Sequence, residues 1–248
     1  LEVTPNAFQI GLALGVYGLT QAIFQIPFGM TSDRFGRKKL IYFGLFLFIV
    51  GSLVAALSNH IEGIIIGRAI QGSGAISAVL TAFLSDVTRD EHRTKAMAII
   101  GASIGLTFAL SLVISPILSI KIGVPGIFLL MAILSMLAIL VIKFCISEPA
   151  DIKKPPIVEY KDIFTILKRL DLNRLNFGIF VLHATQISMF TVIPFYLIDQ
   201  GQLNLESHWT VYLPILVVSF LCIIPIIILS ERWGKTKQFF LFSIVLLL

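Results

Sequence analysis

The chain has 248 residues, of which 57% are hydrophobic and 13% are charged, with a formal net charge of +5. A soluble domain carries about 25% charged residues, because its surface must be wetted, so this composition excludes a soluble globular protein. It also excludes a disordered chain, and two cysteines exclude a disulfide-rich secreted scaffold. With a mean hydropathy of +0.95, the sequence predicts an all-α integral membrane protein with several membrane-spanning helices.

Apolar runs of about 20 residues, the length that crosses a bilayer as a helix, predict seven transmembrane helices and part of an eighth. In chain order they are Phe8–Met30, Leu40–Leu57, Gly63–Ser85, Ala96–Ile120, Gly126–Ser147, Leu175–Ile198, Trp209–Leu229 and the shortened run Gln238–Leu248. The chain begins with Leu1 rather than Met and ends inside an apolar run, so we expect a fragment of a longer protein.

The basic residues are distributed unevenly between the segments that join these helices. Sixteen of the 19 Lys and Arg residues lie in the segments 31–39, 86–95, 148–174 and 230–237. The positive-inside rule predicts that these four segments are cytoplasmic. The positive net charge therefore reflects membrane topology, and the sequence has no aromatic-interleaved basic patch that would predict nucleic-acid binding. The lipid bilayer is the expected partner.

The longest joining segment, 148–174, divides the chain into a first part at 1–147 and a second part at 175–248. Prolines at the start of the segment oppose a helix there. Apolar residues then recur with helical spacing at Tyr160, Ile163, Phe164, Leu167 and Leu170. This pattern predicts an amphipathic helix, which either lies on the inner membrane surface or packs against other cytoplasmic loops.

The loop after the first predicted helix recurs after the seventh. Chemically matched pairs stand in register at Pro27 and Pro225, Ser32 and Ser230, Asp33 and Glu231, Arg34 and Arg232, Gly36 and Gly234, and Arg37 and Lys235. Six predicted helices separate the two copies, so both copies lie on the same side of the membrane. Two parallel six-helix repeats are the architecture of major facilitator transporters.

Two motifs resemble signatures of the major facilitator superfamily. The loop from Gly29 to Lys39 resembles its Gly-x-x-x-Asp-Arg-x-Gly-Arg-(Arg/Lys) motif, and Gly67–Ala75 resembles its fourth-helix motif. Stretches such as Tyr17–Ala22 and Leu84–Arg89 are similar to bacterial drug/proton antiporters. The resemblance implies a major facilitator fold of two six-helix halves, incomplete at both ends here. Residues 1–147 would supply helices 2–6 of the family, and residues 175–248 would supply helices 7–9.

The resemblance also implies that the first loop is a conformational latch that holds the two halves in the outward-facing state. Its residues are Gly29, Asp33, Arg34, Gly36, Arg37 and Lys38, with Asp86 in the next cytoplasmic segment, and the second copy consists of Glu231, Arg232, Gly234 and Lys235. Chemically, Gly29 permits close helix contact, Asp33 can cap a helix, and the basic residues can pair with Asp86, Asp90 or Glu91. The alternative is a basic loop that serves only topology.

Arg68 is a charged residue at membrane depth. Such a charge costs roughly 2.5–3.5 kcal/mol on insertion scales, so it must face protein or water. Gln71 and Gly72 follow three and four residues later on the same helix face. The resemblance implicates this arginine in proton transfer, whereas the alternative is a structural arginine that bonds backbone carbonyls.

His183 shares a helix face with Gln186 and Phe190, and none of the predicted spans contains Asp or Glu. Because histidine changes charge near neutral pH, this face predicts part of a proton or substrate pathway. The alternative is a neutral core histidine bonded to a neighbour. Tyr17, Gln21 and Gln25 form a polar stripe on the first predicted helix, which predicts a cavity lining.

The sequence lacks a phosphate-binding Gly-Lys-Ser/Thr loop and the usual hydrolase motifs, so it predicts neither an ATP-driven transporter nor an enzyme. No metal or cofactor is expected. The resemblance implies a monomeric secondary active transporter of the bacterial cytoplasmic (inner) membrane that works by alternating access. Proton-driven efflux of small hydrophobic or drug-like compounds is the favoured function. The alternatives are proton-coupled or facilitated uptake of a small metabolite, and a truncated membrane module that does not transport.

Overall fold

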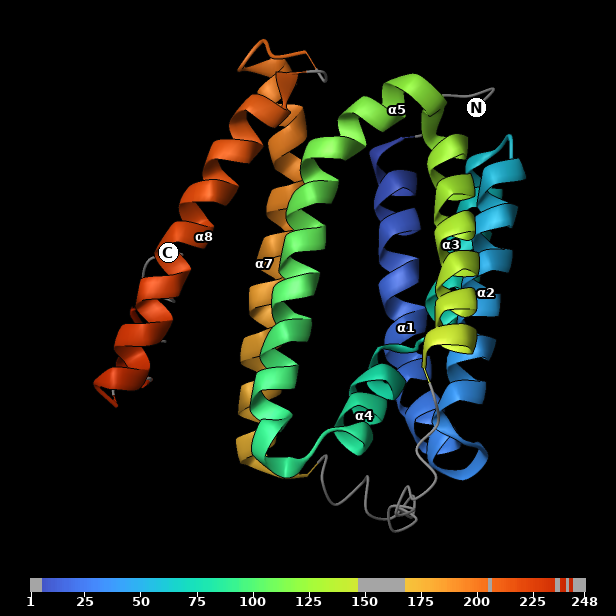
Figure 1. Cartoon of the computed structure of the whole chain (residues 1–248). Helices are drawn as coiled ribbons and strands as arrows, with labels where there is room; N and C mark the ends of the chain where they lie inside the picture. The colour runs from blue at the N-terminus through green and yellow to red at the C-terminus, as the bar shows by residue number, and fades with distance from the viewer. Residues whose placement is uncertain (1–5, 147–167, 205–206, 235–236, 240, 243–248) are drawn as a thin grey trace. The chain divides into compact units, whose positions relative to one another are not determined.

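The structure is a computed structural model that describes residues 6–146, 168–204, 207–234, 237–239 and 241–242 (Figure 1). Its main helices are α1 (Ala7–Phe35), α2 (Arg37–Leu57), α3 (Ile61–Ser73), α4 (Ser77–Val87), α5 (Arg93–Cys145), α7 (Leu170–Asp199) and α8 (Trp209–Arg232). A short 3₁₀ turn covers Asp90–His92, and the described ranges contain no strand. The prediction of an all-α fold is confirmed.

Five helical segments in the described part of the chain are long and apolar enough to cross a membrane. They are Phe8–Phe35, Arg37–Leu57, Ile61–Val87, Asp90–Cys145 and Leu170–Asp199. Helix α8 contributes a shorter apolar stretch, Trp209–Ser219. Most of the predicted run Gln238–Leu248 lies outside the described residues.

The predicted span Gly63–Ser85 lies in the membrane-crossing segment Ile61–Val87, but its helix is interrupted near the centre. Helix α3 ends at Ser73, and α4 begins at Ser77. At the break a Cβ atom on Gly74 would collide with the backbone carbonyl of Gly44 in α2, so glycine permits the close approach there. The backbone N–H of Gly74 donates to the carbonyl of Gln71 at 3.2 Å and closes the end of α3.

The predicted helices Ala96–Ile120 and Gly126–Ser147 both lie in the range labelled α5, which consists of two helices that meet at a bend. The bend is at Gly123, whose φ of +67° is a left-handed conformation that favours glycine. Helix α7 begins at Leu170, inside the segment predicted as a linker. The rest of that linker, including most of its predicted amphipathic helix, lies outside the described residues, so the predicted division of the chain at 148–174 stays a prediction.

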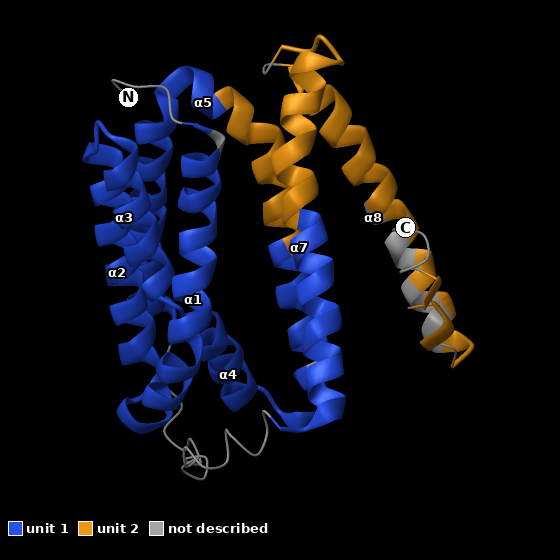
Figure 2. Cartoon of the chain, turned by 180° about the vertical axis from the view of Figure 1, so that it is seen from behind, with its two compact units in different colours: residues 1–104, 118–186 blue, residues 105–117, 187–248 orange. Residues whose placement is uncertain are grey.

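The chain forms two compact units, which Figure 2 shows in different colours. The first unit comprises residues 1–104 and 118–186, and the second comprises residues 105–117 and 187–248. Helices α1 to α4 belong entirely to the first unit, and together we call them the α1–α4 bundle.

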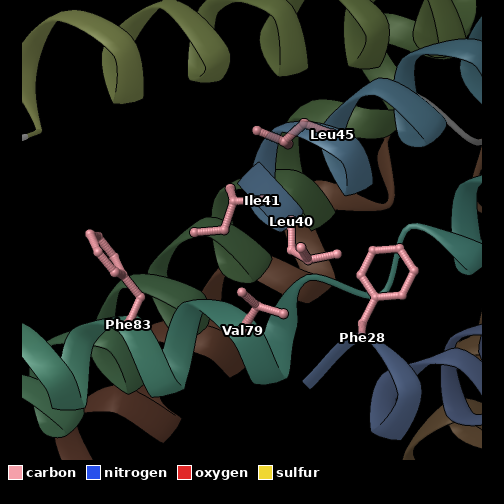
Figure 3. Close-up of a cluster of buried hydrophobic side chains, with 6 residues drawn as sticks. All are labelled: Phe28, Leu40, Ile41, Leu45, Val79 and Phe83. Atoms are coloured by element: carbon pink, nitrogen blue, oxygen red, sulfur yellow. The ribbon is translucent and has the colours of Figure 1, made fainter. Parts of the chain in front are cut away.

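Within the α1–α4 bundle, α3 packs against α1 and α2, and α4 packs against the same two helices. Glycines permit this close packing: a Cβ on Gly67 would lie 2.6 Å from the carbonyl of Gly51, and the reverse contact is 2.5 Å. The buried apolar cluster between α1, α2 and α4 consists of Phe28, Leu40, Ile41, Leu45, Val79 and Phe83 (Figure 3). Small residues and van der Waals contacts hold membrane helices together, because lipid tails are as apolar as the side chains they cover.

Candidate functional site

A single glycine joins α1 to α2. Gly36 ends the first helix and precedes the second, and its φ of +99° is a conformation that L-residues rarely adopt. Its backbone N–H donates to the carbonyl of Ser32 at 3.0 Å. This tight reversal brings the end of α1 next to the first residue of α2, so Asp33 and Arg37 lie beside each other.

Arg37 is the centre of a buried polar network. Its side chain donates from Nη1 to Oγ of Ser32 at 2.6 Å and to Oδ1 of Asp33 at 2.5 Å, and from Nε to Oδ2 of Asp86 at 2.9 Å. Arg37 is 9% exposed and Ser32 is 1% exposed. The Ser32 hydroxyl in turn donates to the carbonyl of Gly29 at 2.6 Å. One arginine therefore ties the end of α1, the start of α2 and the end of α4 together.

The geometry and charge of this network suit a reversible connection. Charge-assisted hydrogen bonds are about twice as strong as neutral ones, and the planar guanidinium presents several donors at once. The side chains of Asp33 and Asp86 keep 25% and 22% of their surface exposed, so water can solvate either carboxylate if Arg37 leaves. Both carboxylates of the network are therefore partly solvated.

The other predicted latch residues differ in their surroundings. Lys38 donates from Nζ to the backbone carbonyl of Ile146, the residue that follows α5. Arg34 is exposed, and Asp90 pairs with Arg93 at 2.8 Å rather than with the first loop. A Cβ on Gly29 would meet no described atom within 4 Å, so the close helix contact expected at Gly29 is not found in the described part of the chain.

The second copy of the motif shares a glycine with positive φ, and its described arginine is exposed. Gly234 has a φ of +61°, a positive value like that of Gly36. Arg232 is exposed at the end of α8. The side chain of Glu231 and the whole of Lys235 lie outside what the structure describes.

Arg68 lies on α3, and its partners are uncharged groups of α1 and of α3 itself. Its guanidinium lies over the ring of Tyr17, with 4.3 Å between the guanidinium carbon and the ring centroid. It donates from Nε to the carbonyl of Ala13 at 3.4 Å and from Nη1 to Oε1 of Gln71 at 3.1 Å. Among the described residues no carboxylate lies within 4 Å of it. A cation–π contact, one backbone carbonyl and one side-chain amide oxygen therefore stabilise the charge of Arg68.

Gln71 and Gly72 connect Arg68 to the rest of the bundle. Gln71 is 1% exposed and donates from Nε2 to Oγ of Ser52 in α2 at 2.6 Å. A Cβ on Gly72 would collide with the Tyr17 carbonyl and with Oγ1 of Thr20, so glycine is needed for α3 to touch α1. Gly72 thus contributes close packing rather than a polar group.

The predicted polar stripe on α1 lines two cavities in the first unit. Tyr17 and Gln21 line a cavity of about 750 Å³ between α1, α2, α4 and α5, and Gln21 donates from Nε2 to Oγ of Ser77 at 3.1 Å. Gln25 lines a second cavity of about 500 Å³ with Ser77, Thr81 and Ser85. The larger cavity is mostly apolar, and its lining contains no charged side chain.

His183 is exposed on α7, and its Nδ1 lies 2.9 Å from the carbonyl of Ile179 in the same helix. Gln186 is also exposed. Phe190 is half-buried, and its ring lies edge-on to Phe108, with 5.0 Å between the ring centroids. Both the pathway role of His183 and the alternative of a core histidine bonded to a neighbour stay predictions. No cluster of three His, Cys, Asp or Glu residues that could bind a metal occurs among the residues described.

Comparison with known proteins identifies the family. Residues 2–248 match the Major Facilitator Superfamily, and the chain belongs to it. The chain is 46% identical over 240 residues to the inner membrane transport protein YajR of Escherichia coli, which covers 96% of this chain and 53% of that protein. It is 46% identical over 221 residues to an uncharacterized transporter of Buchnera aphidicola from Schizaphis graminum, covering 87% of this chain and 55% of that protein.

A more distant similarity, 34% over 118 residues, connects the chain with the class H tetracycline resistance protein of Pasteurella multocida, covering 47% of this chain and 28% of that protein. The chain spans about half the length of YajR and the Buchnera transporter. The family and these transporter names indicate a multi-pass membrane transporter rather than an enzyme, as the sequence predicts.

Sequence reasoning did not find two serines that complete the polar networks, Ser32 and Ser52. Ser32 was visible as one member of the repeated motif, but nothing in the sequence placed it against Arg37. Ser52 and Tyr42 are the only polar side chains between Leu40 and Leu57. A lone hydroxyl in an apolar span was the available signal, although serines in such helices commonly bond only their own backbone.

Proposed function

We propose that this protein is a secondary active transporter that works by alternating access and exports small hydrophobic compounds in exchange for protons. The observation that carries the proposal is the Arg37 network, because it joins three helix ends through one side chain. Transport by alternating access requires two states separated by a few kcal/mol, and a ligand shifts their populations only through its different affinity for each.

The partial exposure of Asp33 and Asp86 supports the assignment of the Arg37 network as a latch. Hydrogen bonds to charged groups contribute about 1.5–3 kcal/mol each, a size that can shift a two-state equilibrium without unfolding the bundle. The basic segments 31–39 and 86–95 lie on the cytoplasmic side in this proposal, so the latch stabilises the closed cytoplasmic face of the outward-facing state.

Arg68 and His183 have separate roles in proton coupling. Arg68 keeps its positive charge at physiological pH, so it attracts or repels the charges of a proton carrier but does not carry the proton itself. His183 is the carrier that this chain offers, because the predicted spans contain no carboxylate. Substrate and proton then compete through linked equilibria.

The direction of transport and the substrate class rest on the similarity to a resistance protein and on the lining of the larger cavity. The similarity to a tetracycline resistance protein covers 47% of the chain and favours efflux. The larger cavity, mostly apolar with amide and hydroxyl groups in its lining, suits a neutral apolar molecule that forms one or two hydrogen bonds.

Inverted inner-membrane vesicles that contain the intact protein test this function. Respiration acidifies their lumen, and a proton-driven exporter then moves its substrate inward. Tetracycline and the fluorescent apolar dye Hoechst 33342 serve as probes. We expect accumulation of at least one probe that stops when a protonophore removes the pH gradient. Accumulation that persists without the gradient would contradict proton coupling, and probe movement out of the lumen would contradict efflux.

A further inference from the structure

Ser52 is a fully buried serine whose hydroxyl makes two hydrogen bonds of different kinds. It is 0% exposed, in the middle of α2. Its Oγ donates to the backbone carbonyl of Phe48 at 2.7 Å and accepts from Nε2 of Gln71 in α3 at 2.6 Å. Ser52 thereby links the backbone of one helix to a buried side chain of the next.

These two bonds fix the direction of the Gln71 side chain. A hydroxyl has one hydrogen, and the Phe48 carbonyl takes it, so Ser52 can only accept a hydrogen bond from Gln71. The NH₂ group of Gln71 must therefore face Ser52, and its carbonyl oxygen must face away. That oxygen accepts from Nη1 of Arg68 at 3.1 Å.

The reversed amide would be unfavourable at both ends. Its NH₂ group would face the Arg68 guanidinium, which carries donors only, and its oxygen would face a hydroxyl whose hydrogen is already used. Gln71 is 1% exposed, so water is not available to replace the lost hydrogen bonds of its amide group. In the observed orientation, hydrogen bonds join the Phe48 carbonyl to the Ser52 hydroxyl, that hydroxyl to the Gln71 amide, and the amide to the Arg68 guanidinium.

We propose that Ser52 is a positioning residue: through the amide of Gln71 it holds the guanidinium of Arg68 in place over the ring of Tyr17. The positioning stands on geometry, and its importance for transport rests on the function proposed above for Arg68. A serine that merely bonds its own helix would not affect Arg68. Ser58 at the end of α2 is such a serine, because its hydroxyl donates to the Val54 carbonyl at 2.5 Å and no described side chain donates to it.

Phenylglyoxal, which modifies accessible guanidinium groups, tests the positioning without any transported substrate. The purified intact protein in lipid nanodiscs is treated with phenylglyoxal, and mass spectrometry of its peptides gives the rate at Arg68. Arg37 is the buried internal reference. We expect Ser52→Ala to accelerate modification of Arg68 about fivefold, the ratio that the net loss of one hydrogen bond gives, while the rate at Arg37 stays unchanged. Ser58→Ala is the matched control and leaves both rates unchanged.

Ser52→Thr and Ser52→Val separate the effect of losing the hydroxyl from the effect of changed packing on the rate at Arg68. Both branch at Cβ and have closely similar shapes, but only threonine keeps an oxygen that bonds the Phe48 carbonyl and accepts from Gln71. In the threonine variant we expect phenylglyoxal to modify Arg68 as slowly as in the wild type. In the valine variant we expect it to modify Arg68 as fast as in Ser52→Ala. If the added methyl group prevents folding of both, the Ser52→Ala measurement still decides.

Two results would overturn the positioning role. One is an unchanged rate at Arg68 in Ser52→Ala, and the other is equal acceleration at Arg68 and Arg37, which indicates general loosening of the bundle. Transport by Arg68→Lys separates this inference from the proposed function. If Arg68→Lys transports normally, the role of Arg68 in coupling fails while the positioning by Ser52 stands.

Discussion

The α1–α4 bundle and helix α7 contain polar residues in opposite settings. In the bundle, Ser32, Arg37, Ser52 and Gln71 are at most 9% exposed, and each is bonded to a side chain on a different helix or helix end. In α7, which carries His183 and Gln186, none of the described residues is buried. A polar residue in the bundle is therefore held in one orientation, whereas His183 bonds a carbonyl of its own helix.

This difference shows that a charged or ionisable side chain in an apolar span can have two different structural settings. Arg68 was recognised as a charged residue, and His183 as a residue that changes charge near neutral pH, each in an apolar span. Arg68 has a cation–π contact with α1 and a glutamine that is itself fixed by α2. Substitutions in the bundle should therefore change both packing and transport, and substitutions on α7 should change transport only.

The largest loss of transport is expected on substitution of Arg68. Arg68→Ala removes the only charge that the bundle holds at membrane depth, and Arg68→Lys replaces the planar guanidinium with a compact ammonium that cannot bond Ala13 and Gln71 in the same way. We expect both variants to lose proton-driven transport by up to about 100-fold, while membrane abundance falls much less. Uptake of probe into inverted vesicles measures the first effect, and immunoblots measure the second. Full transport by Arg68→Ala would leave only a dispensable structural role.

A loss of transport of about tenfold is expected on substitution of Arg37. Arg232, the arginine in the second copy of the motif, provides the matched control. Arg37→Ala leaves Asp33 and Asp86 without their common partner and should remove about 1.4 kcal/mol, a factor of ten, from the proposed outward-facing state. Arg232 is exposed, so Arg232→Ala should change transport by less than twofold.

The latch is measured by the accessibility of single cysteines placed on the two faces of the membrane, in a protein that lacks Cys145 and Cys222. Arg37→Ala should make the cytoplasmic face more accessible, and Asp33→Asn should do so to a smaller degree. Equal accessibility in the wild type and both variants would contradict the latch.

A smaller effect is expected at Lys38. Its ammonium group donates to the carbonyl of Ile146 at the end of α5, where a positive charge stabilises the helix by about 0.3–1 kcal/mol. Lys38→Gln should therefore slow transport by no more than about fivefold and lower the melting temperature slightly. Lys39→Gln, at the neighbouring exposed lysine, is the control. A loss as large as that of Arg37→Ala would mean that Lys38 belongs to the latch itself.

The smallest effect on stability is expected at His183. His183→Gln keeps hydrogen bonding but loses titration, and because the side chain is exposed on α7, the melting temperature should not change. We expect the variant to bind the probe but to lose the pH dependence of transport, measured from about pH 5.5 to 8.5. His60→Gln, at another exposed histidine, should keep that dependence. An unchanged pH profile in His183→Gln would place the proton carrier elsewhere in the protein.

Much of the fold could be predicted from the sequence, because a bilayer imposes a length and a composition on each helix. The predicted helices over Phe8–Met30 and Leu40–Leu57 correspond to α1 and α2, and the turn at Gly36 follows from a glycine in the repeated motif. The close approach of Gly74 to the carbonyl of Gly44 could not be predicted, since it depends on how α2 packs against the break between α3 and α4.

The candidate site likewise has features that the sequence predicts and features that depend on how the helices pack. The sequence alone indicated which residues are expensive to place in a membrane, such as Arg68, and which motif is repeated, because charge and spacing are properties of the chain. Only the tertiary structure decided their partners: Arg37 pairs with Asp33 and Asp86, whereas Arg34, three residues before it, remains exposed. A hydrogen bond depends on distances and directions between atoms far apart in the chain, so the serines that complete the two networks became recognisable only when the helices were packed.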